Sequence, residues 1–149
     1  MRIIIRRFVS LVCVLSLFCG VSCFVSASNS SEDGSSPYAS VYLTDYTAWA
    51  VRSSSNQVYV YYDVTGTRTI GCLGAKLIVV QMNDGGTWKT VKTYTGTTSN
   101  GMLALNDVSH SGAKVYQGSS GNQYRAVVTI FGGSSTSNGD SRIITTNTV

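Results

Sequence analysis

The sequence is poor in the residues on which most catalytic and metal sites depend. Among 149 residues it has one histidine, His110, and one glutamate, Glu32, and three of its four cysteines precede residue 24, which leaves Cys72. One histidine and one cysteine exclude the usual zinc ligand sets, and a lone cysteine excludes an internal disulfide framework. A calcium ion gathered from loops stays open, but the aspartates stand singly without EF-hand spacing. We expect no metal and no cofactor.

Cys72 has two interpretations. A small buried apolar residue is the simpler one. An intermolecular disulfide or a reactive thiol is the alternative, but no other cysteine and no histidine lies near it in the sequence to activate the thiol.

Long charged side chains, which favour helices, are also scarce. Charged residues make up 12% of the chain, and no stretch of about ten residues or more repeats apolar side chains with the period of a helix. Threonine, valine and tyrosine recur instead, and these residues suit the pleated, half-buried surface of a sheet. The composition therefore predicts an all-β protein.

The N-terminus has the order of segments that is typical of a secretory signal peptide. A basic start, Met1–Arg7, precedes an uncharged apolar run, Phe8–Val25, and a small residue, Ala27, ends the segment. We therefore expect a signal-peptide helix over residues 1–27 and a secreted protein, extracellular or associated with the cell envelope. Two alternatives stay open: an uncleaved anchor, which would be the protein's one membrane contact, and a lipoprotein-like acylation site at Cys23.

Removal of this leader changes the charge of the chain. The whole chain carries +4, but three of its eleven basic residues lie in the leader, which leaves eight against seven acids. A nearly neutral chain without a basic stripe does not predict nucleic-acid binding. Residues 28–36 contain no apolar side chain and are predicted to form a disordered spacer. Residues 37–149 suffice for one compact domain.

Alternating apolar and polar positions predict the strands. Gln57–Val64 and Tyr124–Phe131 alternate most clearly. Ala75–Met82 is apolar on both sides, and Asn83–Gly86 then gives a hairpin signal before Thr87–Tyr94. Further strands are expected over residues 38–43, 46–52, 101–106, 113–116 and 141–145. About seven to nine short strands at this spacing predict an antiparallel sandwich or barrel.

Two segments carry a resemblance to a known pattern. Asp84–Val91 resembles the Gly–x–Trp–x–x–Val strand of bacterial immunoglobulin-like modules, and Gly121–Val127 resembles their penultimate strand, in which a tyrosine follows a glycine turn. With its leader and short length, the chain is similar to an uncharacterised family of small exported β-sandwich proteins of Gram-positive bacteria. The resemblance implies an immunoglobulin-like β-sandwich and an exported location, but no activity. Within that fold Trp88 and Tyr124 are interpreted as core aromatic residues, and the Tyr124 hydroxyl is predicted to bond to the backbone as a tyrosine corner.

His110 lies in a segment that contains all the residue types of a catalytic triad. Asp107, Ser109 and Ser111 surround it, but triads are assembled from separate segments and not from sequence neighbours. The Gly–x–Ser–x–Gly elbow of many hydrolases is also missing. We therefore interpret His110 as a solvated loop residue and expect no enzymatic activity. A small secreted hydrolase or toxin stays as an alternative that needs His110 in a pocket.

The remaining functional candidates are aromatic. Tyr59 and Tyr61 share one face of their predicted strand, opposite Val58 and Val60. If this face is solvated, the two rings form a platform suited to sugars or to a protein partner. The alternatives are that this face lies inside and the valines outside, or that neighbouring strands cover it. Trp49 could extend the platform. We expect a non-enzymatic protein that binds or adheres to an unknown extracellular protein or glycan, with a carbohydrate-binding module that uses Tyr59 and Tyr61 as the alternative.

Overall fold

The computed structural model describes residues 40–149, so the predicted leader (1–27) and spacer (28–36) lie outside the described part of the chain. Within this part all the regular elements are β-strands, and every pair of neighbouring strands is antiparallel. This confirms the all-β prediction. None of these residues forms a helix that is long and apolar enough to cross a membrane. The strands are β1 (Leu43–Arg52), β2 (Gln57–Asp84), β3 (Thr87–Thr95), β4 (Leu103–Gln117), β5 (Tyr124–Gly133) and β6 (Gly139–Thr145).

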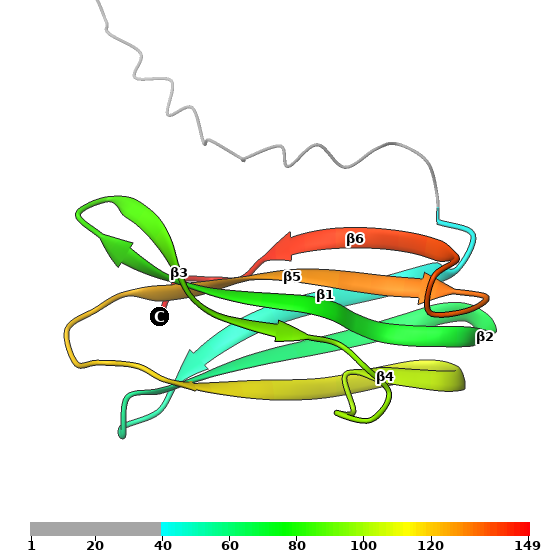
Figure 1. Cartoon of the computed structure of the whole chain (residues 1–149), viewed down its shortest axis with the longest axis horizontal. Coiled ribbons are helices and arrows are strands. Elements are labelled where there is room, and N and C mark those ends of the chain that lie inside the picture. Colours follow the sequence, from blue (N-terminus) through cyan, green and yellow to red (C-terminus); the bar gives the residue numbers. More distant parts are fainter. Residues whose placement is uncertain (1–39) are drawn as a thin grey trace, which may run out of the picture. The chain divides into compact units, whose positions relative to one another are not determined.

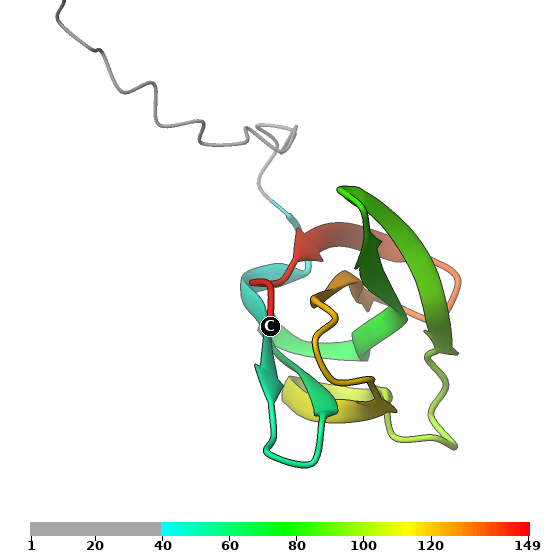
Figure 2. The same ribbon diagram turned by 90° about the vertical axis from the view of Figure 1, so that its left-hand side faces the viewer.

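The long strand β2 organises the sheet (Figure 1). Its first half pairs with β1 on one side and β4 on the other, and its second half pairs with β3 and β5, beyond which lies β6. The ladders shift register between Thr65 and Ile70 and again between Ala75 and Leu77. Such irregularities bend a strand. The sheet therefore curls over into a half-barrel (Figure 2).

Gly74 lies at the bend, where the backbone requires glycine. Its φ is 144°, a region that residues with a Cβ rarely adopt. A Cβ at this position would also lie 2.1 Å from the carbonyl oxygen of Met102. The bend thus depends on a close approach between β2 and the turn before β4.

The described residues form six strands and not the predicted seven to nine, because several predicted strands are parts of longer ones. The segments 57–64 and 75–82 are the two halves of β2, and the segments 101–106 and 113–116 fall largely in β4. Gly66, a residue type that favours turns, lies inside β2. The hairpin prediction is confirmed, since Asp84 pairs with Thr87 across two glycines of positive φ.

The curl brings the inner faces of the two halves of β2 into one core. Alternate residues of β2 and β5 are fully buried, as the sequence pattern predicted. Burial of each such aliphatic side chain contributes about 1.5–3 kcal/mol. The buried members from these two strands include Val58, Val60, Tyr62, Val64, Ile78, Val80, Ala126, Val128 and Ile130.

The half-barrel has two seams, one between β1 and the segment after β6 and one between β3 and β4, where the strands are not paired with each other. A side chain bridges each seam. At one seam Asn147 accepts a hydrogen bond from the Ala50 amide (2.9 Å) and donates one to the Ala50 carbonyl (3.0 Å). The Asn147 side chain thereby satisfies both backbone groups of Ala50, as a neighbouring strand would. At the other seam the Tyr94 hydroxyl donates to the carbonyl oxygen of Val115 (2.6 Å).

Tyr124 is buried, with 1% of its surface exposed, and its hydroxyl accepts a hydrogen bond from the Ser119 amide at 2.9 Å. This confirms the predicted bond from the Tyr124 hydroxyl to the backbone. Burial acts to raise the pKa of Tyr124, but the hydrogen bonds from Ser119 and Asn122 and the charge of Arg52 outweigh it and lower that pKa.

The interpretation of Trp88 as a core residue is wrong. Trp88 pairs with Asn83, and antiparallel partners share a face. That face points outward here, because the neighbouring Met82 packs against the core. Trp88 is half-buried on the outside, where the Arg125 guanidinium lies 4.3 Å from its ring centre.

Candidate functional site

The structure places Tyr59 and Tyr61 on the outer face of β2. Val58 and Val60 are completely buried, so strict alternation directs the two tyrosines outward. Both tyrosine side chains are half-buried. The arrangement in which the valines face solvent and the tyrosines form the core is therefore wrong.

An aromatic row runs across this face. Trp49 of β1 pairs with Tyr61, and their rings stack with centroids 5.3 Å apart and planes 12° apart. Tyr59 stacks on Tyr61 in turn, with centroids 6.1 Å apart and planes 15° apart. Offset stacking of this kind stabilises a pair by about 0.5–1.5 kcal/mol beyond its burial. The row is held in place before any ligand arrives, and 40% of Trp49 remains exposed.

Aliphatic side chains extend the aromatic row on both sides. Val51 of β1 pairs with Tyr59, which pairs with Val115 of β4 on its other side. These valines are 46% and 43% exposed. Two successive rows of the sheet are therefore apolar. We call them the apolar half of the face, and its members are Trp49, Val51, Tyr59, Tyr61, Ala113 and Val115.

The next two rows of the same face are polar. Register pairs Asp63 with Thr47 on one side and Ser111 on the other, and it places Asp45, Thr65 and Ser109 in the row beyond. We call these six residues the polar half. Three of them, together with His110, line a hollow of about 260 Å³: Asp63, Ser109 and Ser111.

Asp63 is exposed, and its carboxylate has no hydrogen-bond or ion-pair partner among residues 40–149. Ser111 pairs with it across the strands, and the Ser111 hydroxyl is also without a partner in this part of the chain. Tyr61 lies two positions from Asp63 on the same face, about 7 Å along the strand. A stacking surface and uncommitted hydrogen-bonding groups therefore adjoin each other.

His110 is not the solvated loop residue that the sequence suggested. It belongs to β4, is half-buried, and its Nε2 lies 2.9 Å from the carbonyl oxygen of Gly101. A carbonyl oxygen only accepts, so Nε2 carries the proton. Nε2 also lies 3.4 Å from the Tyr62 hydroxyl. Burial raises the pKa of Tyr62 to about 12, so that hydroxyl stays protonated at physiological pH.

The predicted neighbours of His110 do not form a triad with it. Asp107 accepts hydrogen bonds from the amides of its neighbours Val108 (2.7 Å) and Ser109 (3.3 Å) within β4. Among the described residues, no hydrogen bond joins His110 to Asp107, Ser109 or Ser111. The geometry thus gives His110 a structural role against the Gly101 turn.

Cys72 is completely buried and unpaired, and it packs with Leu103 and Phe131. Burial raises the pKa of its thiol, which disfavours the reactive thiolate. This agrees with a small apolar residue. Within residues 40–149 no group of three or more histidine, cysteine, aspartate or glutamate side chains could hold a metal ion.

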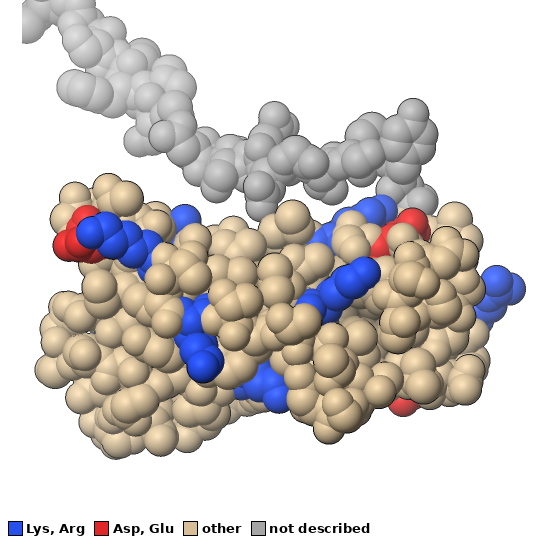
Figure 3. Space-filling view, in the orientation of Figure 1, with Lys and Arg blue, Asp and Glu red and all other residues tan. Residues whose placement is uncertain are grey.

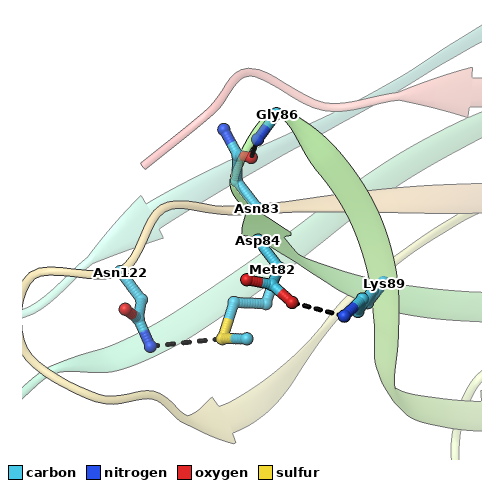
Figure 4. Close-up of polar contacts among 6 residues, drawn as sticks. All are labelled: Met82, Asn83, Asp84, Gly86, Lys89 and Asn122. Carbon is cyan, nitrogen blue, oxygen red and sulfur yellow. Dashed lines mark hydrogen bonds and ion pairs between the residues drawn. The ribbon is translucent and has the colours of Figure 1, made fainter.

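A second hollow lies between the β2–β3 turn and the β4–β5 loop (Figure 4). Its amide groups are largely committed to one another. Asn83 donates to the Gln123 side chain (3.0 Å) and accepts from the Gly86 amide (2.8 Å), and Asn122 contacts the sulfur of Met82 (3.2 Å). Asp84 and Lys89 form an ion pair beside it. The outer face of β1, β2 and β4 offers more uncommitted groups and is the stronger candidate.

Sequence reasoning found part of this face. It named Tyr59 and Tyr61 and considered Trp49, but it gave Asp63, on the same face of the strand, and Ser111 no role in the site. The alternation of residues 109–115, with small or apolar side chains at odd positions, is the signal for β4. The prediction of separate strands over residues 101–106 and 113–116 divides this alternation.

Basic side chains do not gather into one patch on the face seen in Figure 3. This agrees with the scattered lysines and arginines of the sequence. The chain matches no known family model, no curated protein and no solved structure.

Proposed function

We propose that the protein is a secreted or envelope-associated β-sandwich of the immunoglobulin-like kind that acts without catalysis, by binding an extracellular partner. Its contact surface is the outer face of β1, β2 and β4. The observation that carries this proposal is the stacked row of Trp49, Tyr61 and Tyr59 on a rigid sheet. Exposed apolar patches rimmed by polar residues are typical of interaction sites.

Three features support the location and the fold in this proposal. The segment 1–27 has the charge, hydrophobic run and exit residue of a leader. The bond from Ser119 to the Tyr124 hydroxyl is of the tyrosine-corner type that immunoglobulin-like sandwiches use. The curled sheet of two facing layers is compatible with a sandwich.

The state of His110 supports a function without catalysis. A general base must lie within hydrogen-bond reach of its nucleophile. Nε2 of His110 donates to the Gly101 carbonyl, and among the described residues neither nitrogen of the ring is hydrogen-bonded to a serine. Binding through the aromatic row needs none of these groups.

The location is tested by expressing the full chain in an exporting bacterial host. N-terminal sequencing of the product outside the cytoplasm should read from Ser28. A product that starts at Met1 or stays in the cytosol contradicts the proposed processing and location.

The contact surface is tested with the exported protein and cell envelopes of the producing cells. The expected result is that the protein sediments with the envelopes and that Trp49→Ala with Tyr61→Ala releases it. Ile143→Ala is the matched control, because Ile143 is a 63% exposed apolar residue of β6. Equal sedimentation of the double variant and the control would overturn the proposed surface.

A further inference from the structure

We propose that the outer face of β1, β2 and β4 binds a neutral oligosaccharide, with sugar rings on the Trp49–Tyr61–Tyr59 row and sugar hydroxyls on Asp63 and Ser111. This inference rests on the proposed function and names its partner. It draws on both halves of the face, of which the polar half was not foreseen in the sequence.

The apolar half matches one side of a sugar. A pyranose ring presents C–H groups on its face and hydroxyls around its rim, so it packs on an aromatic ring without losing hydrogen bonds. Trp49 and Tyr61 are already stacked at 5.3 Å and Tyr59 follows at 6.1 Å, so little side-chain freedom is lost on binding. A row of rings, unlike a single ring, suits an extended chain of sugars.

The polar half matches the sugar's rim. A carboxylate accepts hydrogen bonds from hydroxyl donors, and such charge-assisted bonds are stronger than neutral ones. Asp63 has no partner in the described chain and lies at the wall of the hollow with Ser109 and Ser111. Each serine hydroxyl can both donate and accept. The ladder places these groups next to Tyr61 and Ala113, in the adjacent row.

The charge on the face decides against an anionic ligand. The twelve residues of the two halves include two acids, Asp45 and Asp63, and no lysine, arginine or histidine. A phosphate, a nucleic acid or an acidic polysaccharide would meet two carboxylates without a counter-charge. The ligand should therefore be uncharged.

The same carboxylates decide against a second copy of the chain as the occupant. Packing this face against its own copy would bury Asp45 and Asp63 without a basic partner, and burial of an unpaired charge is strongly unfavourable. A sugar leaves the rim partly solvated and supplies donors to the carboxylate. The structure thus favours a hydroxyl-rich ligand over a dry apolar one.

The test uses the exported protein and soluble hexasaccharides of glucose, xylose, mannose and N-acetylglucosamine, with binding measured by titration calorimetry. We expect saturable binding of at least one hexasaccharide. Trp49→Ala should weaken it about tenfold, which corresponds to about 1.4 kcal/mol. Trp49→Phe should retain most of the affinity because it keeps a ring.

The polar contribution is tested with Asp63→Asn, which keeps the shape and removes the charge. We expect it to weaken binding several-fold. Asp84→Asn is the matched control, because Asp84 is an exposed carboxylate at the far hairpin, and Ile143→Ala is the apolar control. Both should bind like the original protein. Unfolding temperatures of all variants exclude loss of the fold as the cause.

The outcomes separate this inference from the proposed function. If no hexasaccharide binds, or if Trp49→Ala and Asp63→Asn bind as tightly as the original protein, the proposal that this face binds a glycan is wrong. The contact surface still stands in that case if the envelope sedimentation is lost on Trp49→Ala with Tyr61→Ala. A concentration-dependent dimer that is abolished by Trp49→Ala, without sugar binding, would replace the glycan by a second copy.

Discussion

Substitution of Gly112 by alanine should destabilise the protein through one neighbour, Tyr62. The two residues are directly paired between β2 and β4. A Cβ on Gly112 would lie 2.4 Å from the Tyr62 hydroxyl oxygen and 2.7 Å from the ring carbon that bears it. Ordinary contact therefore requires the ring to retreat by about 1 Å, into a core that is already closely packed.

The cost of this retreat follows from the surroundings of Tyr62. The side chain is 1% exposed, and its hydroxyl lies 3.3 Å from the carbonyl oxygens of Gly101 and Met102. Overpacking of a core costs about 1–3 kcal/mol. For a domain near this size, each kcal/mol lowers the melting temperature by about 4 °C or more. We expect Gly112→Ala to melt about 5–15 °C below the original protein.

The double variant with Tyr62→Phe tests the cause. Tyr62→Phe alone should cost under about 1 kcal/mol, since the Gly101 carbonyl keeps its bond from His110 and the Met102 carbonyl keeps its bond from the Ala75 amide. With the hydroxyl removed, Gly112→Ala should cost less than it does in the original protein, by about 1 kcal/mol. Urea unfolding followed by circular dichroism measures all four proteins. Strictly additive costs would refute the clash as the mechanism.

Three further predictions concern the seams and the tyrosine corner. Tyr124→Phe should lower the free energy of unfolding by about 1 kcal/mol in urea titrations, because the Ser119 amide loses its acceptor; an unchanged unfolding midpoint would count against the corner. Asn147→Ala should speed amide hydrogen exchange at Ala50, because the Ala50 amide loses its hydrogen-bond acceptor. Equal exchange rates in the two proteins would show that this amide is protected in another way. The pKa of Asp140 is lowered, chiefly by the hydrogen bond from the Ser40 hydroxyl. The ionised Asp140 therefore contributes stability above the unfolded pKa of about 3.9, and this contribution is lost as the pH falls below that value. Asp140→Asn should remove this part of the acid sensitivity, and pH–stability curves that run parallel for the two proteins would contradict the assignment.

Local patterns in the sequence were enough to find the faces of single strands. In Gln57–Val64 the alternation of valine and tyrosine is strict, so the inward and outward sets could be separated. The hairpin at Asn83–Gly86 was readable because two glycines supply the positive φ values that a tight turn needs. Both features depend on residues within a few positions of each other.

Strand continuity and neighbours could not be predicted, since they depend on distant parts of the chain. Gly66 has the residue type of a turn, yet it pairs with Leu43 of β1, and β4 pairs with β2 both before it, up to Thr65, and after it, from Ile70. Asn106, with φ of 53°, interrupts the pattern of β4 without ending the strand. The candidate site was the hardest part to predict, because Asp63 and Ser111 come together only through the pairing of β2 with β4.

The fold and the proposed contact surface share β2 but use opposite sides of it. Register along the first half of β2 is fixed by its buried side chains, because a slip by one residue would expose all of them. Tyr59, Tyr61 and Asp63 therefore keep their outward positions whatever occupies the face. Substitution of Trp49 or Asp63, which are exposed, should alter binding while the core stays intact. If Asp63→Asn instead lowered the unfolding midpoint as far as Gly112→Ala does, the two sides of β2 would not be separable, and the face would have to be understood as part of the folding core.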